Sequence, residues 1–105
     1  MRIQPGTSTP VNHEILTVDN SATGTKLTVA KYAKAQTAYI MVEGSPIRFW
    51  FDAIPTATEG IYLKIGDEIE LDSMAEISNF TAISTTAVDA KLSIVYNAWG
   101  ENKWE

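Results

Sequence analysis

The chain has 105 residues, of which 45% are hydrophobic, and a formal net charge of −5 at pH 7, so it has room for a single domain. Its eight Lys and Arg residues are scattered, whereas phosphate binding depends on clustered basic side chains, so neither nucleic acid nor an anionic membrane is expected as a partner. The absence of cysteine excludes disulfides and thiolate metal sites, and no apolar run approaches the ~18 residues of a membrane-spanning helix.

The first third of the chain predicts an arm, two strands and little helix. Residues 1–10 are polar and contain two prolines, which indicates an extended N-terminal arm. Residues 11–18 alternate weakly and residues 26–30 alternate clearly between apolar and polar side chains, so both are predicted strands. Residues 19–24 have the composition of a turn. Residues 30–36 favour helix but lack an apolar stripe, so we expect a single helical turn or a loop there.

The rest of the chain carries a stronger β pattern. Further strands are predicted at 38–43, 47–52, 61–65, 68–72, 77–83 and 90–96. The two short alternating runs on either side of Gly66-Asp67 predict a hairpin. Residues 97–105 follow the last predicted strand and are expected to form a C-terminal tail.

Seven or eight short strands, separated by regularly spaced turns, define the expected fold class. The pattern predicts an all-β domain over residues 11–96, built as an antiparallel β-sandwich, with a jelly roll as one form of it. The alternation also predicts which apolar side chains face the interior of the sandwich. These are Ile40, Val42, Phe49, Phe51, Leu63, Ile65, Ile69, Leu71, Phe80, Ile83, Leu92 and Ile94.

The polar residues predict no catalytic or metal site. His13 is the only histidine, so no second imidazole or thiolate can share a metal ion with it. Glu68, Glu70 and Asp72 would share one strand face and could bind Ca²⁺, but their alternation with apolar residues favours a solvated face that protects a sheet edge. Residues 55–60 have the composition of an ordered turn. We therefore expect no enzyme activity and no cofactor.

A set of short motifs resembles one class of proteins. A hairpin pattern matches Ala38–Gly44 with Arg48, Phe49 and Asp52, and a loop-and-turn pattern matches residues 55–60 and 63–71. Two closing strands match residues 80–83 and 90–96. In this order, over a little more than half of the chain, the motifs are similar to those of small virion structural proteins of tailed bacteriophages. Ala53-Ile54 replaces the usual Gly-Thr of the pattern, and residues 1–36 match no part of it.

The resemblance implies a function in assembly. A protein of this class is a β-sandwich that decorates or cements the phage particle, so the implied partner is the major capsid protein or another virion protein. It also implies a homo-oligomer, and quasi-threefold positions on a capsid would favour a trimer. The implied location is the virion, after assembly in the host cytoplasm, and the start of the chain lacks the apolar core of a signal peptide. The component of the virion, whether head, neck, tail or fibre, stays open.

Three tryptophans are the candidate interface residues. Trp50 has the opposite pleat parity to Phe49 and Phe51, so it should face outward or into a second layer. Trp99 and Trp104 follow the last predicted strand, where a small domain has little core to offer them. Exposed aromatic side chains anchor protein interfaces, but they also pack in a core or stack on sugar rings. The alternative function is therefore a carbohydrate-binding β-sandwich module.

Overall fold

The computed structural model describes residues 8–99 of the chain. Within these residues it contains eight strands and two short helices. The strands are β1 (Ser8–Val18), β2 (Thr25–Lys26), β3 (Thr37–Glu43), β4 (Ile47–Trp50), β5 (Ile61–Leu63), β6 (Glu68–Leu71), β7 (Thr81–Ser84) and β8 (Ala90–Trp99). The helices are α1 (Val29–Tyr32) and α2 (Met74–Asn79).

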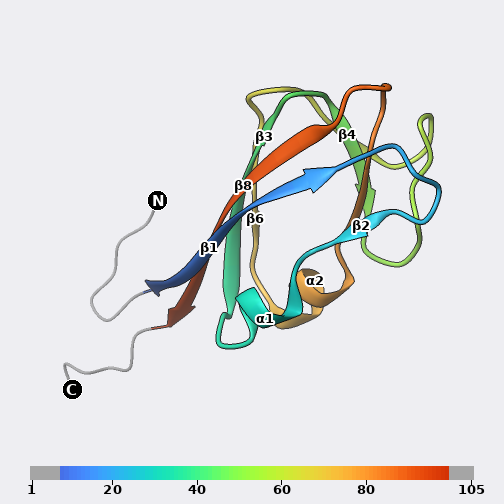
Figure 1. The fold of residues 1–105 in the computed structure, drawn as a ribbon. Coiled ribbons are helices and arrows are strands. Elements are labelled where there is room, and N and C mark those ends of the chain that lie inside the picture. Colours follow the sequence, from blue (N-terminus) through green and yellow to red (C-terminus); the bar gives the residue numbers. More distant parts are fainter. Residues whose placement is uncertain (1–7, 100–105) are drawn as a thin grey trace, which may run out of the picture.

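The strands form two four-stranded antiparallel sheets packed face to face (Figure 1). One sheet has the order β1-β8-β3-β6 and the other β2-β7-β4-β5. Every link between consecutive strands crosses from one sheet to the other, except the link from β4 to β5. This connectivity of two interleaved Greek keys defines an eight-stranded jelly roll. The predicted all-β sandwich is confirmed, and the jelly roll is its form.

The predicted hairpin around Gly66-Asp67 is wrong, because its two strands belong to different sheets. β5 pairs with β4, whereas β6 pairs with β3. The turn between them is bound to β3: the amide of Val42 donates to the carbonyl of Asp67 at 3.0 Å, and the amide of Gly66 donates to the carbonyl of Val42 at 2.8 Å. For the same reason β3 and β4, which the motif pattern joins as a hairpin, lie in different sheets.

The two helices are local features of the loops. α1 is a single helical turn, one of the two forms expected for residues 30–36. It begins at Val29, and the strand predicted over residues 26–30 is wrong except at Lys26, which belongs to β2. α2 corrects the strand predicted over residues 77–83, of which only residues 81–83 lie in a strand, β7. The helix begins after Ser73, whose Oγ accepts the amide of Glu76 at 3.1 Å, while Glu76 Oε1 accepts the amide of Asp72 at 2.6 Å. The Ser73 bond is the N-cap half of a capping box, whereas the Glu76 carboxylate binds the amide of Asp72, one residue before the cap.

The core lies between the sheets and largely follows the predicted inner face. Phe51, Leu63 and Ile69 are half-buried against it, and Ile65 is 57% exposed because β5 ends before it. Ile83 is buried, but its neighbour Ala82 faces the core, so Ile83 lies on the outer face of its sheet. The remaining predicted residues are fully buried in the core: Ile40, Val42, Phe49, Leu71, Phe80, Leu92 and Ile94.

The first and last strands are longer than the sequence predicted. Ser8 of β1 pairs with Trp99 of β8, so residues 8–10 of the predicted arm and 97–99 of the predicted tail are strand residues. In Figure 1 the two strands run side by side beyond the body of the sandwich. The pairing explains the extension, since each of these polar segments supplies the hydrogen-bond partners of the other. The remaining parts of the arm and tail lie outside the described residues.

Candidate interaction surfaces

The outer face of the β1-β8-β3-β6 sheet carries exposed apolar side chains on three neighbouring strands. Val11 and Ile15 of β1 are 41% and 71% exposed, and Val95 of β8 and Tyr39 of β3 are each 36% exposed. His13, Val95 and Tyr39 are opposite one another across the three strands, so these side chains share one surface. We call the set Val11, Ile15, Tyr39 and Val95 the apolar face. Large apolar side chains gathered on one surface are typical of contacts with other molecules.

Acidic residues border the apolar face on β6. Glu68 and Glu70 are exposed, and they pair with Met41 and Tyr39 of β3. A hydrogen bond with Glu68, together with the charge of its carboxylate, raises the pKa of the Tyr39 hydroxyl. β6 is an edge strand, so these charges lie where they discourage pairing with a foreign strand. Within residues 8–99, no group of three or more His, Asp or Glu side chains is placed to hold a metal ion.

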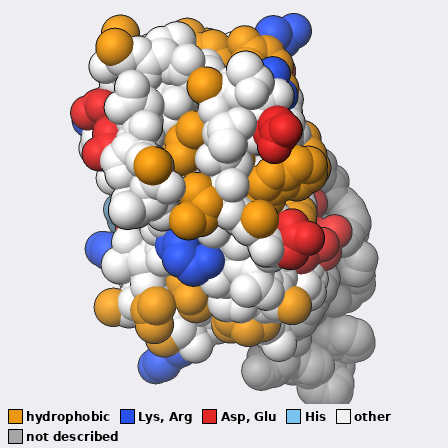
Figure 2. Space-filling model, turned by 90° about the vertical axis from the view of Figure 1, so that its right-hand side faces the viewer, with side chains coloured by type: hydrophobic (Ala, Val, Ile, Leu, Met, Phe, Trp, Pro, Cys, Tyr) orange, Lys and Arg blue, Asp and Glu red, His pale blue; other side chains and the backbone are white. Residues whose placement is uncertain are grey.

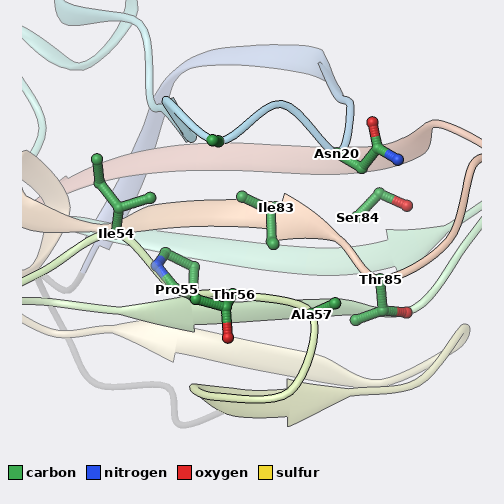
Figure 3. Close-up of a pocket in the computed structure, with 9 residues that line it drawn as sticks. Asn20, Ile54, Pro55, Thr56, Ala57, Ile83, Ser84 and Thr85 are labelled. Atoms are coloured by element: carbon green, nitrogen blue, oxygen red, sulfur yellow. The ribbon is translucent and has the colours of Figure 1, made fainter.

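A shallow groove lies over the other sheet, between the loop that follows β1 and the loop that follows β4. Figure 3 shows Asn20 on one side, Ile54, Pro55, Thr56 and Ala57 on the other, and Ile83 of β7 between them. Its volume is about 360 Å³. Figure 2 shows this side of the molecule with hydrophobic atoms scattered among polar and backbone atoms and with basic and acidic side chains interspersed. The groove thus mixes apolar and hydroxyl groups without a charged ligand-binding residue.

The loop at residues 55–60 is the ordered turn that the sequence predicted. Thr56 Oγ1 accepts the amides of Thr58 and Glu59 at 3.2 and 2.9 Å. Arg48 holds the loop from below, because its guanidinium donates to the carbonyls of Ala57 and Gly60 at 3.0 and 2.8 Å. These bonds commit Arg48 to the fold, so the loop is a structural cover over the sheet.

The three tryptophans do not form one site in the described structure. Trp50 is half-buried on β4, on the face opposite to Phe49, and pairs with Thr81. Trp99 lies on β8 in the other sheet; its side chain and the whole of Trp104 lie outside the described residues. The sequence reasoning instead missed the apolar face. The sequence feature that could have indicated this face is the adjacent apolar pair Ile15-Leu16. One of the two side chains must point away from the core, but alternation does not show which one.

Beneath the apolar face, Glu14 is part of a hydrogen-bonded cluster at the interior side of β1. Its carboxylate accepts the Tyr96 hydroxyl at 2.6 Å and the Thr28 hydroxyl at 2.8 Å. Burial first, and then the hydrogen bond and charge of Glu14, raise the pKa of Tyr96 far above its usual range. His13, next along β1, is exposed, and its amide donates to Asn12 Oδ1. The cluster anchors the segment before α1 to the sheet.

The chain was compared with protein families, curated proteins and solved structures. No protein-family model, no curated protein and no solved structure matches the chain. In the described part of the chain, no helix is long and apolar enough to cross a membrane.

Proposed function

We propose that the chain is an accessory structural protein of a tailed-bacteriophage virion, of the capsid decoration or cement type. It binds the major capsid protein or another virion protein and reinforces the particle, and it has no enzyme activity. The observation that carries the proposal is the apolar face, which presents Ile15, Tyr39 and Val95 on a rigid sheet. The ordered motifs between Ala38 and Tyr96 support the choice of a phage particle as the partner.

The proposed mechanism is burial of the apolar face between subunits. Removing apolar surface from water contributes about 25 cal/mol per Å², and the aromatic ring of Tyr39 offers a large contact area together with a hydroxyl for hydrogen bonding. The strands below the face are held by the sandwich, so little conformational entropy is lost on binding. A homo-oligomer seated on the shell would multiply these contacts.

Binding to empty shells tests this proposal. The purified chain is mixed with shells assembled from the major capsid protein encoded in the same genome, and copies bound per shell are counted after sedimentation. We expect saturable binding that Val95→Lys reduces at least about tenfold, since it places a charge in a buried contact. The matched control is Val88→Lys, because Val88 is 60% exposed in the loop before β8.

Two outcomes of this experiment would contradict the proposal or its contact surface. A wild-type chain that does not sediment with the shells would overturn the proposal. Equal loss of binding in the two lysine variants would show that the apolar face is not the contact.

Carbohydrate binding is the second candidate. It is favoured by Tyr62, which is 46% exposed on the outer face of the second sheet with the Arg48 guanidinium 5.0 Å from its ring centre. Aromatic rings of this kind stack on sugars. A glycan array with wild type and Tyr62→Ala tests it: a sugar signal that this variant abolishes would support it, and a blank array would remove it.

A further inference from the structure

Strand β1 has the longest edge among the described edge strands. It ends its sheet and contains eleven residues. The other edge strands are blunted: β6 carries Glu68 and Glu70, while β2 and β5 have only two and three residues. Charges and short strands prevent edge-to-edge pairing, whereas a long edge with free amides and carbonyls is a template for another strand. β1 therefore offers a longer row of edge amides and carbonyls than the other three edge strands.

The backbone groups on this edge can be assigned. The amide of His13 donates to the side chain of Asn12 at 2.9 Å, so it does not point at β8. Backbone groups point in the same direction at every second residue of a strand, so Ile15 and Thr17 also face the free edge. Among residues 8–99, no backbone hydrogen bond reaches β1 from a loop or from a strand other than β8.

The regular part of β1 has a defined centre. The register with β8 shifts between Pro10 and Asn12, so the uninterrupted stretch runs from Asn12 to Val18, and its midpoint is Ile15. Ile15 is 71% exposed. The residues that flank it on the same face, His13 and Thr17, carry no formal charge at pH 7, so no like charges would oppose each other if this stretch paired with itself.

We infer that two copies of the chain pair antiparallel through their β1 edges, around a two-fold axis at Ile15. Ile15 of each copy lies opposite Ile15 of the other, and His13 lies opposite Thr17. The amides and carbonyls of these three residues form the ladder, and the two sheets become one continuous eight-stranded sheet. The occupant is a second copy because the stretch is self-complementary about its midpoint, which a two-fold interface requires. The proposed dimer differs from the trimer that quasi-threefold capsid positions would favour.

The pairing specifies the self-contact of the proposed accessory protein. It is measured in solution without particles, whereas shell binding is measured through Val95, which is not on the edge strand. Failure of the pairing therefore leaves shell binding standing, and failure of shell binding leaves the pairing standing.

Single cysteine variants test the register directly, because the natural chain has no cysteine. Residues directly opposite in a hydrogen-bonded antiparallel pair have Cα atoms about 5.5 Å apart, within the range of a disulfide. Ile15→Cys is expected to cross-link to itself under mild oxidation. His13→Cys is expected to cross-link only when mixed with Thr17→Cys, since two His13 positions would be about 14 Å apart. Ile65→Cys, at an exposed turn position, is the control.

Sedimentation equilibrium of the full chain supplies the second measurement. We expect a monomer–dimer equilibrium whose dissociation constant rises at least about tenfold in Ile15→Lys and is unchanged in Ile65→Lys. A wild-type chain that stays monomeric, or an Ile15→Cys cross-link no faster than that of Ile65→Cys, would overturn the inference. Efficient self-cross-linking of His13→Cys would overturn it too, because it requires a different register.

Discussion

The hydroxyl group of Tyr96 donates a 2.6 Å hydrogen bond to Glu14 Oε2, which joins the interior sides of β8 and β1. Tyr96 has no exposed surface and is the largest fully buried side chain of the core. A buried phenol against a carboxylate is satisfied only while both partners are present. The same carboxylate accepts Thr28, so one pair of residues holds the edge strand, its neighbour and the segment before α1 together.

Removal of the Tyr96 hydroxyl should destabilise the fold. Tyr96→Phe keeps the ring but leaves one carboxylate oxygen of Glu14 without its buried donor, and hydrogen bonds to charged groups contribute about 1.5–3 kcal/mol. We expect a loss of that size in the free energy of unfolding, measured by urea denaturation. Tyr39→Phe is the control, because its hydroxyl lies at the surface. Equal losses of unfolding free energy in the two variants would show that the hydrogen bond to Glu14 does not contribute more to stability than a surface hydroxyl does.

The stability of the fold at alkaline pH should depend on the Tyr96 hydroxyl. The pKa of Tyr96 in the folded chain is raised above the unfolded value of 10.0, by burial first and by Glu14 second. A raised folded pKa stabilises the fold below the unfolded pKa, so this contribution is lost as pH rises above about 10. We expect the free energy of unfolding to fall there, and tyrosinate absorbance to show Tyr96 ionising only on unfolding. The decline should be smaller in Tyr96→Phe; an identical decline would assign it to other groups.

Ser84 should be essential to one end of the sandwich. Its side chain is buried and donates to the carbonyl of Val88 at 2.6 Å, while it accepts the amide of Thr86 at 3.3 Å. Ser45 Oγ, on the turn between β3 and β4, lies 3.0 Å away. Ser84→Ala removes the acceptor of the Thr86 amide and the shortest hydrogen bond to the Val88 carbonyl, at a cost of about 1–3 kcal/mol, measurable as a lower urea midpoint. Ser93→Ala, a half-exposed position, is expected to change little.

Alanine substitutions at Gly60 and Gly66 should distinguish the cost of steric crowding from the cost of backbone strain. Gly60 has φ +134°, and a Cβ there would lie 3.0 Å from Pro55 Cβ and 3.1 Å from Arg48 Cβ. Gly66 has φ +94°, but nothing lies within 4 Å of its Cβ position. Gly66→Ala should therefore cost only the strain of positive φ, about 1–2 kcal/mol, whereas Gly60→Ala adds about 1–3 kcal/mol of overpacking. Thermal unfolding measures both; a smaller loss for Gly60→Ala would contradict the packing argument.

The alternation of apolar residues located most of the strands and most of the core. Ile40, Val42, Leu92 and Ile94 repeat every second residue in strands buried on one face, and all four are fully buried. The period is a local property, because side chains of a strand point to opposite faces whatever lies beside it. Helix α2 was missed although its signal is local: Ser73 and Glu76 have capping-box spacing.

What the sequence by itself determined is the fold class, the approximate positions of most strands and the absence of cysteine chemistry. Which sheet each strand joins was decided only in the tertiary structure, because a short turn such as Gly66-Asp67 serves equally within a sheet and between sheets. Tertiary structure also decided that Ile15 is exposed while Leu16 faces inward, since the face of an adjacent apolar pair depends on pairing with β8. The candidate surfaces follow from those long-range pairings, which no local pattern encodes.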